Sequence, residues 1–78
     1  MPDFVVALTE IIKESKQIEQ IDVDAPLLAH GILDSFDIIT LVARIEEDFG
    51  ILLDGEAITA EHFKSINTIA ALLRSEQG

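Results

Sequence analysis

The stretch from Asp34 to Gly50 constrains the fold most, because it has the pattern of an amphipathic helix with both of its ends marked. Asp34 is a favourable residue just before a first helical turn, and Gly50 supplies a natural stop after the last one. Between them, apolar residues recur at helical spacing and define a face that must be buried. That face carries Ile38, Leu41, Val42, Ile45 and Phe49. We therefore expect other helices to pack against this one.

Similar patterns on either side predict the rest of the architecture. A helix is expected from Asp3 to about Ser15, and a last helix is expected after a capping Ser65, ending before the polar tail 75–78. Residues 59–63 suit one short helical turn, capped by Thr59, that follows a turn at Asp54-Gly55. Residues 16–31 lack periodicity and form a long loop, a length more often functional or tightly packed than idle.

The fold class is thus all-α: a small four-helix bundle with three longer helices, one short helix and a long loop between the first two helices. At 78 residues, the chain forms a single domain, 1–78. The remaining expected core positions come from all of these segments. They are Phe4, Leu8, Ile11, Leu28, Ile51, Phe63, Ile66, Ile69 and Leu73.

The charge balance points to protein partners. Fifteen acidic residues against five basic ones give a formal net charge of −10, which repels nucleic acids and anionic lipid surfaces and favours encounter with basic protein patches. Without cysteine, the chain has no disulfide framework and no thiolate zinc site. No segment has the pattern of a signal peptide or of a membrane span. We expect a cytoplasmic monomer.

The same helix carries a second apolar stripe that the core does not need. Phe36, Ile39 and Ala43 lie well away from the buried face when residues are placed at about 100° intervals around the axis. An ordered apolar stripe edged by charge is typical of a docking surface. The alternative is that the long loop folds over Phe36 and Ile39 and buries them.

Ser35 lies where the loop becomes the helix, with a carboxylate on either side of it. The positive end of a helix suits a covalently attached phosphate, so Ser35 is interpreted as an attachment point and not as a nucleophile. The plainer alternative is an ordinary serine at a helix start. His30 and His62 have no second ligand at useful spacing, and the adjacent acidic residues 46–48 do not converge on one ion, so no metal site is predicted.

The run Gly31-Ile32-Leu33-Asp34-Ser35-Phe36-Asp37 resembles the Asp-Ser-Leu phosphopantetheine attachment motif of acyl and peptidyl carrier proteins. It is most similar to the Leu-Asp-Ser-Phe form of stand-alone carriers such as the D-alanyl carrier protein. The resemblance continues through residues 46–51, and the order of the helices extends it over nearly the whole chain. Taken together, these features make the match fairly specific.

The resemblance implies a non-catalytic carrier with a swinging arm. A phosphopantetheinyl transferase would attach 4′-phosphopantetheine from coenzyme A to Ser35, and a loading ligase would place an acyl or aminoacyl group on the arm as a thioester. Downstream transferases with basic patches would then receive it. Phe36, Ile39 and Ala43 would meet apolar surface on these partners. Their Lys and Arg side chains would meet Asp34, Asp37, Glu46, Glu47 and Asp48.

Two departures from the fatty-acid carriers modify this expectation. Those carriers usually place a glutamate five or six positions beyond the serine, where this chain has Thr40 and Leu41, and this chain adds a positive charge at Arg44. A specialised pathway, such as polyketide or nonribosomal peptide biosynthesis, is therefore favoured over housekeeping fatty acid synthesis. The alternative from another class is an unmodified acidic adaptor that binds a partner through the second stripe.

Overall fold

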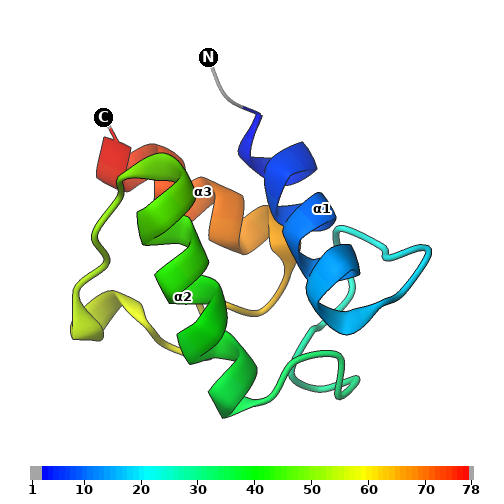
Figure 1. The fold of residues 1–78 in the computed structure, drawn as a ribbon. Helices are drawn as coiled ribbons and strands as arrows, with labels where there is room; N and C mark the ends of the chain where they lie inside the picture. Colours follow the sequence, from blue (N-terminus) through cyan, green and yellow to red (C-terminus); the bar gives the residue numbers. More distant parts are fainter. Residues whose placement is uncertain (1–2, 78) are drawn as a thin grey trace.

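The computed structural model describes residues 3–77, and all regular structure in that range is helical. The elements are α1 (Phe4–Lys16), α2 (Ser35–Phe49), the 3-10 helix η1 (Gly55–Ala57) and α3 (Ile66–Gln77). The three α-helices surround a common centre (Figure 1). The start of α1 and the end of α3 lie at one end of the bundle, whereas α2 begins at the opposite end. The all-α prediction is therefore confirmed.

The helices begin and end at residues with clear capping chemistry. Asp3 accepts hydrogen bonds from the amides of Val5 and Val6, at 3.1 and 3.2 Å, and thereby starts α1. Gln17 takes a left-handed conformation that ends α1, and Gly50 does the same for α2. At the start of α3, the Thr68 amide donates to Ser65 Oγ at 3.2 Å. The predicted capping role of Ser65 is thus confirmed, although α3 continues beyond the predicted end into the tail.

The short helix lies earlier in the chain than the sequence predicts. The turn expected at Asp54-Gly55 tightens into η1, with the Ala57 amide donating to the Asp54 carbonyl at 2.9 Å. At the predicted position, residues 59–63 form a single hydrogen-bonded turn, in which the Thr59 side chain accepts from the His62 amide at 3.2 Å. Thr59 therefore caps as expected, but the turn ends at Phe63, two residues before Ser65 caps α3.

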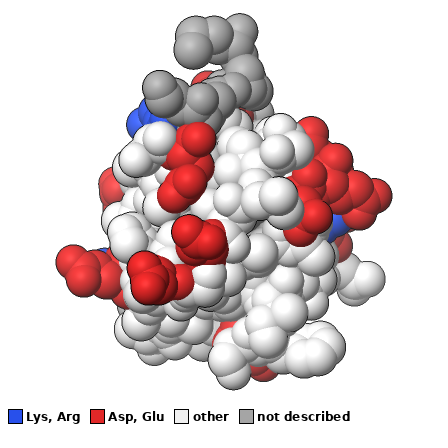
Figure 2. Space-filling view, turned by 90° about the vertical axis from the view of Figure 1, so that its left-hand side faces the viewer, with Lys and Arg blue, Asp and Glu red and all other residues white. Residues whose placement is uncertain are grey.

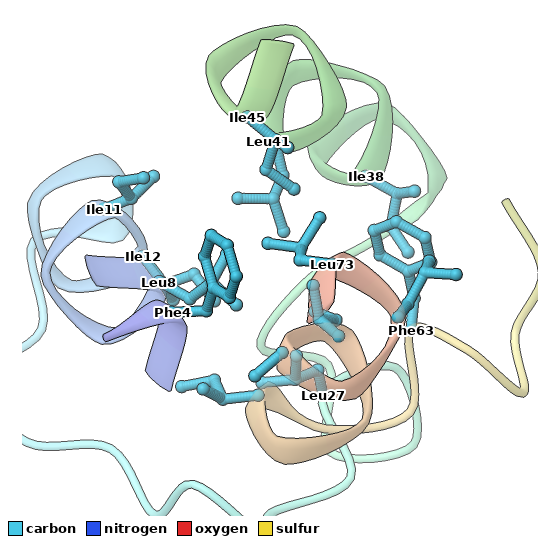
Figure 3. Packing of buried hydrophobic residues seen from close by; sticks show 14 of the residues in the cluster. Phe4, Leu8, Ile11, Ile12, Leu27, Ile38, Leu41, Ile45, Phe63 and Leu73 are labelled. Atoms are coloured by element: carbon cyan, nitrogen blue, oxygen red, sulfur yellow. The ribbon is translucent and has the colours of Figure 1, made fainter. Parts of the chain in front are cut away.

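The core is filled from all three α-helices and from the segments that connect them. Figure 3 shows their side chains pointing toward one another between α1, α2 and α3, together with Leu27 and Phe63. Most predicted members are buried, but Leu28, Val42 and Phe49 are only partly buried. Buried members that the sequence analysis missed are Ile12, Leu27, Leu33, Ala70 and Leu72.

The long loop is tightly packed because Leu27 anchors it. The Leu27 side chain is fully buried, its amide donates to the Lys64 carbonyl at 2.8 Å, and its carbonyl accepts from the amides of Ile32 and Leu33 at 2.9 and 3.1 Å. A second clasp joins the Asn67 amide to the Val23 carbonyl at 3.1 Å. These bonds direct the loop against the start of α3 and bring Leu27, not the predicted Leu28, into the core.

The loop does not cover the second stripe of α2. Phe36 is 74% exposed and Ile39 is 66% exposed, so the alternative in which the loop buries them is wrong. Ala43 is exposed as well. The structure therefore leaves an apolar stripe on α2 open to solvent, starting one residue after Ser35.

Candidate functional site

Ser35 is the first residue of α2, and its side chain is exposed. Two features of the preceding loop place it there. Gly31 adopts a left-handed backbone conformation, with a φ of 71°, that other residues rarely take, and buried Leu33 fixes the chain just before the helix. The Ser35 hydroxyl makes no hydrogen bond to another described residue, so it is open to a modifying protein.

A reciprocal pair of hydrogen bonds fixes the first turn of α2 around Ser35. The Asp37 amide donates to Asp34 Oδ1 at 2.8 Å, and the Asp34 amide donates to Asp37 Oδ2 at 3.1 Å. The amides of Ser35 and Phe36 are left without a helical acceptor, as at any helix start. These free N–H groups and the positive end of the helix dipole suit a phosphodiester on Ser35, so the residues present fit the expected arm.

An ion pair ties this end of α2 to the end of α1. Lys16 Nζ donates to Asp37 Oδ2 at 2.8 Å, onto the same oxygen that closes the capping pair. The bond to Lys16, followed by the backbone of Asp34, holds the pKa of Asp37 below its ordinary value of 3.8. The bond to Asp37, together with the nearby charge of Asp34, raises the pKa of Lys16 above 10.5. Asp37 is thus a structural contact between helices as well as a surface carboxylate.

An open, largely apolar hollow of about 350 Å³ lies beside Ser35. It is bounded by α2 on one side and by residues 58–60 on the other. Its lining residues are Leu28, Ser35, Ile38, Ile39, Ile58, Thr59 and Ala60. The sequence analysis missed this hollow, because nothing in the sequence signals that residues 58–60 lie next to Ser35.

The acidic residues predicted to meet partners occupy different surroundings. Glu46 and Glu47 are exposed, with no ion pair to another described residue. Asp48 pairs with Arg44, whose Nη2 lies 3.2 Å from Asp48 Oδ2. Figure 2 shows one face of the molecule, where acidic side chains dot a surface with little visible positive charge. The excess of acidic residues in the sequence is therefore visible on the surface of this face.

Among the described residues, neither His30 nor His62 has neighbours that would give it a catalytic or metal-binding role. His62 Nδ1 lies 3.0 Å from Thr59 Oγ1 within the turn at 59–63, and His30 is an exposed loop residue. Among residues 3–77, no three His, Cys, Asp or Glu side chains gather where they could hold a metal ion. No helix in the same range is long and apolar enough to cross a membrane.

Comparison with known families bears directly on this arrangement of an exposed serine at a helix start. Residues 6–74 match the family described as "Phosphopantetheine attachment site". The chain belongs to this family. It is accordingly a non-catalytic carrier whose prosthetic group is 4′-phosphopantetheine, and a phosphopantetheinyl transferase is one of its partners.

Comparison with individual proteins gave one further result. No curated protein matches the carrier. Among solved structures, it is similar to a chain of the structure described as "Crystal structure of FAD-dependent dehydrogenase", with 32% sequence identity and a TM-score of 0.76. The match covers 85% of the carrier and 97% of that chain.

The pKa of Asp37 should depend on Lys16. In the folded carrier the lowered Asp37 pKa contributes stability that is present above pH 3.8 and is lost as the pH falls through the folded value. The raised Lys16 pKa contributes stability that is present below pH 10.5 and is lost as the pH rises through its folded value. Lys16→Met should therefore raise the Asp37 pKa toward 3.8, as measured by NMR titration.

Lys13→Met is the matched control, since it removes a lysine from the same helix turn without touching Asp37. The Asp37 pKa should then stay at its wild-type value. Equal Asp37 pKa values in Lys16→Met and the wild type would show that the ion pair has no effect in solution.

Proposed function

We propose that Ser35 carries the 4′-phosphopantetheine arm and that the arm holds an acyl or aminoacyl group as a thioester for delivery to partner enzymes. The observation that supports this most is the exposed Ser35 hydroxyl at the first position of α2, with free amides beside it. A transferase can reach this oxygen without unfolding any part of the carrier. The chain has no thiol of its own, so the arm supplies the only thioester-forming sulfur.

Partner enzymes dock, in this proposal, on the exposed stripe of Phe36, Ile39 and Ala43. The stripe begins next to Ser35, so a protein that covers it also receives the base of the arm. Acidic side chains around the stripe attract basic partners and set the rate of association more than the final affinity. Such binding suits a carrier, which must deliver its cargo and then dissociate.

The cargo belongs, in our proposal, to a specialised pathway. Thr40 and Leu41 stand where a glutamate is usual in fatty-acid carriers, and Leu41 is buried, so it cannot serve as a docking residue. Arg44 adds a positive charge to the same helix. Because of these differences, α2 presents a different surface to partner enzymes. We therefore expect that this carrier does not replace the carrier of housekeeping fatty acid synthesis.

Replacing Ser35 with Ala should abolish attachment of the arm. Incubation with coenzyme A and a broad-specificity phosphopantetheinyl transferase should raise the intact mass of the wild type by one arm and leave Ser35→Ala unchanged. Ser15→Ala removes another exposed serine and should be modified fully. Modification of Ser35→Ala would contradict the assignment, and failure of the wild type to react with several active transferases would favour the unmodified adaptor.

Replacing Ile39 with Asp should weaken docking and leave the fold intact. Because Ile39 is 66% exposed, the change should alter helical content and thermal stability little, while kcat/KM of the transferase falls about tenfold or more. Val6→Asp introduces the same charge at an exposed apolar residue of α1 and should leave kcat/KM nearly unchanged. Circular dichroism and steady-state kinetics measure the two effects. Equal kinetics for both variants would exclude the stripe as the docking site.

A flavin-dependent dehydrogenase is a candidate partner. The support is the 32% identity to a chain of a crystal structure that is described as an FAD-dependent dehydrogenase. Such an enzyme should then transfer two hydrogens from the acyl or aminoacyl group on the holo-carrier to FAD. Intact-protein mass spectrometry measures the resulting loss of mass. Ile39→Asp loaded with the same group should react more slowly. An unchanged mass with a panel of active dehydrogenases would remove this partner class.

A further inference from the structure

Two cations lie against acidic residues of α2, and both pairs occupy the same side of that helix. Lys16 contacts Asp37 at 2.8 Å, and Arg44 contacts Asp48 through Nη2 at 3.2 Å and through Nε at 3.3 Å. Arg44 follows Asp37 by two helical turns and precedes Asp48 by one, so these three residues share one face. The pairs thus form a row along α2.

Within this row, Asp37 and Arg44 face α1 and not the docking stripe. A small crevice between the two helices is lined by Ile11, Ile12 and Ser15 of α1 and, on α2, by Asp37, Thr40 and Arg44 among others. Cations and carboxylates here lie within contact distance of one another, so their fields largely cancel at the distance of an approaching protein. Asp37 and Asp48 therefore present little net charge to a partner.

The remaining acidic residues at the end of α2 have a different position. Glu46 and Glu47 follow Ala43 by three and four residues, which places them beside the stripe of Phe36, Ile39 and Ala43. Both are exposed, and neither makes an ion pair within the described residues. Their full charges border the surface that partners cover.

We infer that Lys16 and Arg44 sort the acidic residues of α2 into a neutralised pair, Asp37 and Asp48, and a partner-facing pair, Glu46 and Glu47. The inference rests on the proposed docking through α2 and deepens it. A protein that binds the carrier places Lys and Arg side chains at the carboxyl-terminal half of α2 and an apolar pocket near Ser35. Partners thus recognise charge at the carboxyl-terminal end of α2 and apolar surface at the end near Ser35.

Double variants that each lose one cation and one carboxylate provide the test. Asp48→Asn alone would leave Arg44 unpaired, so the pair is removed as a whole in Arg44→Gln/Asp48→Asn. Variants that combine Arg74→Gln with Glu47→Gln or Glu46→Gln have the same net charge. With the transferase and coenzyme A at low salt, these two controls should each lower kcat/KM about three- to tenfold, and Arg44→Gln/Asp48→Asn should change it less than about twofold. Added salt should reduce the difference between these variants.

Removal of Arg44 gives a change of opposite sign. Arg44→Gln should release Asp48 and raise kcat/KM at low salt, and this gain should vanish when Asp48→Asn is also present. Arg74→Gln removes an exposed cation from α3 and should give a smaller gain that does not depend on Asp48. Circular dichroism checks that each variant keeps its helical content.

The outcomes separate this inference from the proposed function. If Arg44→Gln/Asp48→Asn lowers kcat/KM as much as Arg74→Gln/Glu47→Gln, or if the Arg44→Gln gain persists when Asp48 is also replaced, the sorting is wrong and docking through α2 stands. If none of these variants alters kcat/KM and Ile39→Asp is also neutral, docking through α2 itself is wrong.

Discussion

The geometry of the attachment site depends on the contacts of the Asp37 carboxylate. A single oxygen of this side chain accepts from the Asp34 amide and from Lys16 Nζ, so it closes the first turn of α2 and also holds that turn against the end of α1. Exposed ion pairs contribute little to global stability. These contacts matter here because they fix the position of Ser35, which lies between Asp34 and Asp37 in the chain.

The long loop brings α2 to this position without adding a helix. Leu27 inserts into the core and is bonded through its backbone to the Lys64 carbonyl and to the amides that precede α2. Backbone groups beside a buried residue such as Leu27 need hydrogen-bond partners, and these bonds supply them. The loop therefore works as a packed spacer between two antiparallel helices, and it leaves the outer face of α2 bare.

Local patterns in the sequence were sufficient for the helices and for much of the site. Capping residues such as Asp34 and Gly50 mark the ends of α2, and helical spacing alone separates the exposed Ile39 from the buried Ile38. Leu28 was predicted in the core in place of Leu27, because the loop has no periodicity that separates the two. The ion pair between Lys16 and Asp37 was also missed, since it joins residues that only the folded loop brings together.

The direction of the helices has a practical meaning for a protein that must visit several enzymes. Phe4, at the start of α1, packs edge-on against Phe49 at the end of α2, with ring centroids 5.2 Å apart, and α3 finishes near the same pole (Figure 1). Ser35 occupies the other pole. A solid surface, a label or a neighbouring domain that is attached at Phe4 or at the last turn of α3 would lie at the pole opposite Ser35. It would therefore leave the loaded arm free to move.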